Sequence, residues 1–99
     1  MKTFGTHNYY VYILTNKGKK VLYTGVTNDL KIRIHQHQHS VNSFTAKYKC
    51  FYLLFYERFQ EIEDAIKREK QIKGWSRNKK NILITTFNES WTFLNETIE

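Results

Sequence analysis

Two short runs of strand-forming residues near the beginning of the chain constrain its fold more than any other feature. Residues 9–14 and 21–26 are rich in aromatic and β-branched side chains, which favour extended strands. The segment between them contains Asn16 and Gly18, residue types that favour turns. The pattern therefore predicts a β-hairpin.

The register of this hairpin decides where its tyrosines lie. If Thr15 and Lys20 close the loop, Tyr12 pairs directly with Tyr23 on one face of the ribbon. A slip of one residue would turn a strand over and separate the two rings. We predict the direct pair, which by default is an ordinary cross-strand contact in a core.

A first helix is expected after the hairpin. Asn28 is suited to the N-cap position, and the helix should run to about Gln38. The residues on or beside its apolar face would be Leu30, Arg33, Ile34 and His37. Residues 39–47 are polar and show no clear period, so we interpret them as a loop.

A third strand and a C-terminal helix follow. Residues 50–59 are almost continuously apolar, which predicts a strand buried on both faces at the centre of the sheet, with Cys50 as a buried thiol. Ser76 is suited to cap a helix over residues 77–86. The residues expected to reach the core from this helix and the segment after it are Ile82, Leu83, Phe87, Trp91 and Phe93.

Glu69 breaks the pattern of the helix predicted between them. This helix covers residues 61–73 and ends at Gly74, and its expected buried stripe is formed by Ile62, Ala65, Ile66 and Ile72. Glu69 lies on the same stripe, where a carboxylate is costly unless it is paired, hydrogen-bonded or bound to a metal. Three interpretations stay open: a structural ion pair with an arginine, a helix end that emerges into solvent, or a metal ligand in a cleft.

The elements together predict an α+β fold in the order β-β-α-β-α-α, with a three-stranded, mainly antiparallel sheet flanked by helices. We expect one domain over residues 1–99, with a core of about 8–87 and residues 88–99 packing on it. One cysteine cannot form an intramolecular disulfide, which fits the reducing cytoplasm. We expect neither a signal peptide nor a membrane span, because no apolar stretch is long enough.

The positive charge of the chain predicts a polyanionic partner. Lysines and arginines number 16 against 9 acidic residues, giving a formal net charge of +7. Nucleic acid is the commonest partner of such a surface, although a solvated basic face is the simpler alternative. The candidate phosphate contacts are Lys17, Lys20, Arg68, Lys73, Arg77 and Lys80.

Several motifs occur in a fixed order along the chain. The sequences YVY at residues 10–12 and YTG at 23–25 are followed by Arg33 and His37 in the first predicted helix and by Glu69 in the second. This order and spacing resemble the GIY-YIG nuclease superfamily. The REKQIKGWSR sequence that contains Glu69 resembles its short, stand-alone bacterial subgroup, the UPF0213 proteins.

This resemblance implies hydrolysis of phosphodiester bonds in nucleic acid, with DNA favoured over RNA and structure-specific or repair-type substrates included. It implies an endonuclease site formed by Tyr12, Tyr23, Arg33, His37 and Glu69. Glu69 would hold one divalent ion, Mg²⁺ or Mn²⁺. Either tyrosine would orient or deprotonate water, with His37 assisting, and Arg33 would stabilise the phosphate charge.

The chain departs from the superfamily pattern at some positions. Tyr10 stands where the first motif has Gly, and Thr24 stands where the second has Ile. The catalytic Asn that follows the glutamate helix in several members has no secure counterpart. The alternative functions are a nucleic-acid-binding module of the same fold with little or no cleavage, and a protein-interaction domain that uses the basic surface.

Overall fold

The computed structural model describes residues 8–39 and 43–98 of the protein. Its strands form one antiparallel sheet in the order β2-β1-β3. The predicted α+β fold and element order are confirmed, with a short helix and a final 3₁₀ helix in addition. The elements are β1 (Tyr9–Thr15), β2 (Leu22–Thr27), α1 (Leu30–His39), α2 (Phe44–Tyr48), β3 (Tyr52–Phe59), α3 (Ile62–Lys73), α4 (Arg77–Phe87) and η2 (Asn95–Ile98).

The hairpin register differs by two residues from the predicted one. Tyr12 lies across from Gly25, and Tyr23 lies across from Leu14. Because side chains alternate with a period of two, this shift keeps both tyrosines on one face. Their ring centroids are 6.3 Å apart, so a diagonal contact replaces the direct pair. Gly25 makes this possible, since a Cβ atom there would overlap the Tyr12 hydroxyl.

The loop of the hairpin accounts for the shift. The side-chain oxygen of Asn16 accepts hydrogen bonds from the backbone N–H groups of Lys20 (2.8 Å) and Val21 (3.2 Å). These two residues therefore belong to the loop and not to the strand. As a result Thr15 pairs with Leu22, and the predicted closing pair of Thr15 and Lys20 is wrong.

The strand β1 is central and β3 lies at an edge of the sheet, so the predicted central position of the third strand is wrong. Residues 11–15 of β1 are all buried. In β3 the consecutive residues Leu53, Leu54 and Phe55 are buried as well, as predicted. Burial on both faces of β3 comes from the helices that cover the sheet and not from a second neighbouring strand.

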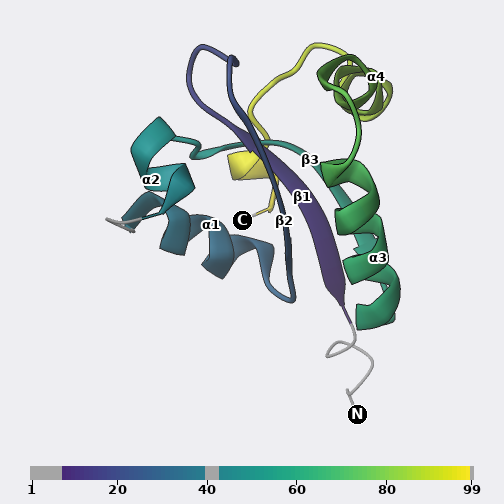
Figure 1. Ribbon diagram of the computed structural model, residues 1–99. Helices are drawn as coiled ribbons and strands as arrows, with labels where there is room; N and C mark the ends of the chain where they lie inside the picture. The colour runs from purple at the N-terminus through teal and green to yellow at the C-terminus, as the bar shows by residue number, and fades with distance from the viewer. Residues whose placement is uncertain (1–7, 40–42, 99) are drawn as a thin grey trace.

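Helices cover both faces of the sheet, with α1 and α2 on one side and α3 and α4 on the other (Figure 1). Alternate residues of β1 point into two separate cores. The core under α3 and α4 includes Val11, Ile13, Leu54, Ala65, Ile72 and Ile84. The core under α1 includes Tyr12, Leu14, Leu30, Ile34, Cys50 and Leu53.

Capping side chains set where two of the helices begin. The α1 helix is capped by Asp29 in place of the predicted Asn28, because the Asp29 carboxylate accepts a hydrogen bond from the N–H of Ile32 (3.0 Å). Ser76 caps α4 as predicted, accepting from the N–H of Lys79 (3.2 Å). These caps fix the residue at which each of the two helices begins.

The helices α3 and α4 bury fewer residues than their sequences predict. Ala65, Ile72 and Ile84 are fully buried, and Leu83 packs against them partly exposed. A sheet of three strands offers each helix only a narrow surface, so the flanking apolar residues stay outside. The residues predicted in the core but found 37–59% exposed are Ile62, Ile66, Ile82 and Phe87.

The segment after α4 returns to the sheet. The N–H of Leu94 donates to the carbonyl oxygen of Leu53 (2.8 Å). Trp91 packs partly buried against the core, as predicted. Phe93 does not: it is 36% exposed and stacks on Tyr52, with ring centroids 4.3 Å apart. Within the described residues, no helix has the length and apolar character needed to cross a membrane.

Candidate active site

A chain of buried hydrogen bonds runs from β1 to α2. The hydroxyl of Tyr12 lies 2.8 Å from Nε2 of His37, and Nδ1 of the same ring lies 2.8 Å from the hydroxyl of Thr45. The hydroxyls of Thr45 and Ser43 are 3.0 Å apart. Since both ring nitrogens have partners, the orientation of the imidazole is set.

Burial determines the protonation states in this chain. It raises the pKa of Tyr12 to about 12, against the opposing effect of a hydrogen bond with Arg33. Burial, followed by the positive charge of Arg33, lowers the pKa of His37 to about 4. At neutral pH the pair is therefore a phenol and a neutral imidazole. We assign the Tyr12 O–H as donor to Nε2 and the Nδ1–H as donor to Thr45.

Arg33 lies beside both tyrosines of the hairpin. Hydrogen bonding with Tyr12 is the main reason why the pKa of Arg33 is raised, and Tyr23 contributes in the same direction. The ring centroid of Tyr23 is 5.3 Å from that of His37. The structure thus brings together the four residues that were predicted for this face, although the hairpin register was wrong.

Two surface pockets meet at Arg33 and Gln36, which line both of them. The first has a volume of about 370 Å³ and is completed by Tyr23, His37, Ser43, Phe44 and Thr45. The second has a volume of about 420 Å³ and is completed by Tyr9, Val26, Thr27, Asn28, Ile62 and Ile66. The exposed isoleucines of α3 therefore line a surface that passes the edge of the sheet and reaches α1 and α2.

Glu69 lies on α3 and lines neither of these two pockets. Its side chain is 13% exposed, and its carboxylate lies 2.7 Å from Nζ of Lys73, four residues later. The negative charge of Glu69 raises the pKa of Tyr12, as the smallest of the named influences on that phenol. An ion pair was one of the predicted interpretations, but the partner is Lys73 and not an arginine.

The surroundings of Glu69 fit a hard divalent cation that takes few protein ligands. Mg²⁺ usually keeps several waters and binds through one or two carboxylates together with substrate phosphates. Glu69 supplies one such carboxylate. Across residues 8–39 and 43–98, no group of three or more His, Cys, Asp or Glu side chains could hold a metal ion. An all-protein metal cage therefore does not form in that part of the chain.

The helix α2 was missed in the sequence, where residues 39–47 read as a loop. Ser43 caps it by accepting a hydrogen bond from the N–H of Ala46 (3.2 Å). The available signal was a serine ahead of an apolar residue, but a helix of five residues shows no period. Thr45, which this helix supplies to His37, was missed with it. Residues 40–42 lie outside the described part of the chain.

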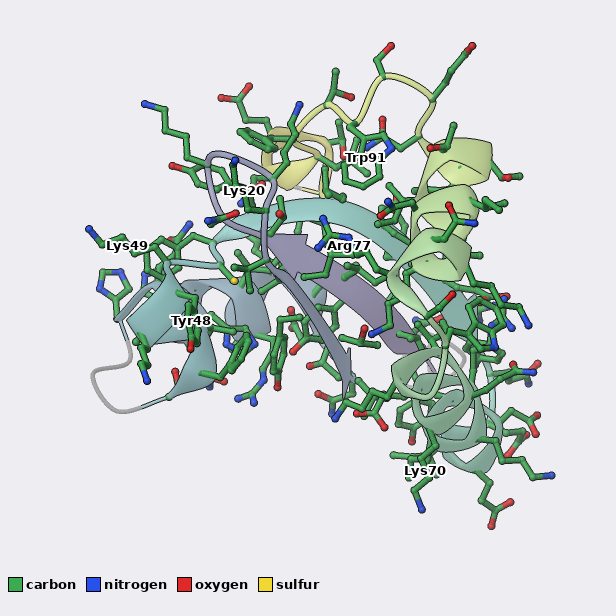
Figure 2. All side chains as sticks on the ribbon, turned by 45° about the horizontal axis from the view of Figure 1, so that its top comes forward. Lys20, Tyr48, Lys49, Lys70, Arg77 and Trp91 are labelled. Atoms are coloured by element: carbon green, nitrogen blue, oxygen red, sulfur yellow. The ribbon has the colours of Figure 1, made fainter. Side chains whose placement is uncertain are left out.

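Arg77, predicted as a phosphate contact, is used within the fold. Its guanidinium donates to the backbone carbonyl oxygens of Lys20 (2.8 Å) and Lys19 (3.1 Å), tying α4 to the hairpin loop. Figure 2 shows Arg77 between the hairpin and α4, on the same side as Lys20. The ammonium groups of Lys17 and Lys20 belong to exposed residues.

Arg68 and Lys73 also have acidic partners. Arg68 forms an ion pair with Glu57 (3.0 Å) and lies over the ring of Trp75, 5.2 Å from its centroid. Lys73 pairs with Glu69. Lys80, the last of the predicted contacts, is partly exposed on α4. Three of the four predicted phosphate contacts on α3 and α4, namely Arg68, Lys73 and Arg77, are therefore engaged within the fold.

Comparison with known proteins identifies the class to which this fold and site belong. The family model of the GIY-YIG catalytic domain matches residues 8–81, which include all five candidate site residues. The chain therefore belongs to the GIY-YIG family of nuclease domains, for which nucleic acid is the implied substrate.

Within this family the chain is similar to the UPF0213 proteins. It is 38% identical over 78 residues to one from Clostridium perfringens, covering 78% of this chain and 83% of that protein. It is 36% identical over 78 residues to one from Staphylococcus saprophyticus, covering 78% and 94%. The solution NMR structure of a UPF0213 protein from Bacillus halodurans matches with a TM-score of 0.52 and 35% identity, covering 80% of this chain and 84% of that one.

Proposed function

We propose that the protein is a divalent-metal-dependent endonuclease that hydrolyses phosphodiester bonds in DNA. The observation that carries the proposal is the buried contact between Tyr12 and His37 at 2.8 Å, with Arg33 beside it and a pocket leading to solvent. Both ring nitrogens of His37 have hydrogen-bond partners, so burying this side chain costs little stability. One of these partners, Tyr12, is itself titratable, and contacts between buried titratable groups are typical of active sites.

The two tyrosines have different roles in this proposal. Tyr12 is buried and protonated, so it cannot accept a proton from water while it keeps its own. It donates its O–H to Nε2 of His37 and so orients the imidazole, whose ring lines the pocket where water and phosphate would lie. Tyr23 lines the pocket and is partly exposed, so it orients the water or the phosphate. Arg33 stabilises the negative charge that develops on the phosphate.

Glu69 would hold the divalent ion, Mg²⁺ or Mn²⁺. When bound, this ion supplies Lewis-acid stabilisation of the phosphate and of the leaving oxygen. Without the ion, Lys73 neutralises the Glu69 carboxylate, which limits the free-energy cost of keeping this carboxylate largely buried. Loading of the site therefore requires Lys73 to release or share Glu69.

The test is cleavage by the purified protein, with Mg²⁺, Mn²⁺ or chelator, of single-stranded, duplex and branched DNA and of RNA. Glu69→Ala should abolish cleavage and preserve binding, because the carboxylate is needed only for the ion. Glu63→Ala is the matched control, since Glu63 is an exposed glutamate on the same helix. Cleavage that survives Glu69→Ala contradicts this site. Salt-sensitive binding without cleavage in any condition indicates the binding module instead.

A further inference from the structure

Three aromatic rings, Tyr23, Phe44 and Tyr48, form a row, and the first two of them line the pocket beside His37. The ring centroid of Phe44 lies 5.9 Å from that of Tyr23 and 4.7 Å from that of Tyr48. Phe44 and Tyr48 are 47% and 41% exposed. Large aromatic side chains exposed as a group, and not singly, indicate a surface that contacts another molecule.

The exposure of this row is a consequence of how α2 is anchored. Thr45 is the buried residue of α2, and it is held by its hydrogen bond to His37. Phe44 and Tyr48, which are four residues apart, lie together on another side of the helix. The contact that orients the histidine therefore also turns the aromatic pair outward.

The pocket behind the row combines flat apolar walls with polar edges. Tyr23 and Phe44 supply the ring surfaces, while Gln36, Ser43 and Arg33 supply hydrogen-bonding groups. Its volume of about 370 Å³ lies within the range of sites that bind small organic groups, about 300–1,000 Å³. Such a lining suits a planar ring with a polar rim, which is the chemistry of a nucleobase.

Positive charge accompanies the row at its outer end. Nζ of Lys47 lies 5.4 Å from the ring centroid of Tyr48, and Lys49 is exposed next to it. Figure 2 shows Tyr48 and Lys49 at the same end of the molecule, away from Lys70. Phosphates on both sides of a bound base would thus meet Arg33 at one end and these lysines at the other.

We propose that Tyr23 and Phe44 stack against an unpaired base next to the scissile phosphate, so that the substrate class is single-stranded nucleic acid or a duplex with unpaired nucleotides. Bases inside a duplex are covered by their neighbours and cannot offer a ring face to these side chains. This inference rests on the proposed nuclease function, because it places the base in the pocket of the same site.

The experiment measures binding of labelled single-stranded and duplex DNA of one sequence, in chelator so that no cleavage occurs. Phe44→Leu should weaken single-strand binding about five- to a hundredfold, the range for loss of one stacked base, and should change duplex binding less than about twofold. Phe44→Trp should retain the preference. Phe87→Leu is the matched control, because Phe87 is equally exposed on α4.

A second measurement reports the contact itself. The fluorescence of 2-aminopurine at an unpaired position should be quenched by the wild type and less so by Phe44→Leu. Equal losses on single strands and duplexes overturn the inference, as does a shift of Phe44→Leu to a different oligomeric state with binding unchanged. If the wild type binds with this preference but never cleaves, the nuclease proposal fails and the stacking site stands. If it cleaves but Phe44→Leu shows no change in preference, only the stacking site fails.

Discussion

The two faces of the sheet hold polar residues in different ways. Beneath α1 and α2, Tyr12 and His37 are buried and bonded to each other in a chain that opens onto a pocket. On the other face, Arg68, Lys73 and Arg77 are bound to parts of the fold, as Arg77 is to the hairpin carbonyls. The comparison teaches that charge in the sequence indicates attraction, whereas buried and connected polar groups indicate chemistry.

The two faces should differ most in how the loss of an arginine affects cleavage. We expect Arg33→Ala to reduce cleavage by about 10²–10³-fold, because a donor to the developing phosphate charge is lost. Arg68→Ala should have only a small effect, since Arg68 pairs with Glu57 on the other face. Single-turnover rates of the two variants measure this directly. Similar losses in both would show that overall charge, and not position, matters, and would erase the distinction between the faces.

A smaller effect is expected at Thr45. Thr45→Val keeps the shape but leaves Nδ1–H of His37 without an acceptor, which should cost about 1–3 kcal/mol of unfolding free energy. The rate of cleavage should fall roughly tenfold, because the imidazole that Thr45 no longer orients is the one that contacts Tyr12. Thr45→Ser should restore both quantities. Urea unfolding and cleavage assays on the same preparations provide the measurement, and an unaffected rate in Thr45→Val would remove Thr45 from the site.

On the opposite face Arg77 should matter for stability and not for binding. Arg77→Ala should lower the free energy of unfolding by about 1 kcal/mol, since its hydrogen bonds to the hairpin carbonyls are exposed. The Arg77→Lys variant keeps the charge, but its single ammonium group cannot donate to both carbonyl oxygens as the forked guanidinium does. This variant should therefore lose a similar amount of stability and bind nucleic acid normally. Weak binding by Arg77→Lys with normal stability would instead make Arg77 a phosphate contact.

The last comparison concerns pH. The pKa of His37 falls from 6.5 to about 4 on folding, so between these pH values the unfolded chain binds the extra proton. The stability that depends on keeping His37 neutral is therefore fully present above pH 6.5 and is lost as the pH falls towards 4. His37→Gln should show a shallower loss of stability in this window. His39→Gln, at an exposed position of the same helix, should match the wild type in unfolding curves measured across the pH range.

The site was accessible from the sequence wherever local periodicity controls placement. Arg33 and His37 are four residues apart, so one helix carries both toward the same side. The shift of the hairpin by two residues did not separate Tyr12 from Tyr23, because an even shift preserves the face of each side chain. Glu69 stood out because a carboxylate on an apolar stripe is anomalous in any helix of this kind.

Other features depended on contacts between distant segments. Nothing near Thr45 in the chain indicates its hydrogen bond to His37, because it forms only when α2 packs against α1. The edge position of β3 was likewise settled by the packing of the strands.

The amino-acid sequence by itself determined the order and type of the main elements, since alternation, helical periodicity and capping residues act over a few positions. Only the tertiary structure decided the hairpin register, through the side chain of Asn16, and the burial that makes Tyr12 a protonated phenol beside a neutral His37. Burial of a titratable group is a property of everything packed around it, which is why it could be read only from the folded molecule.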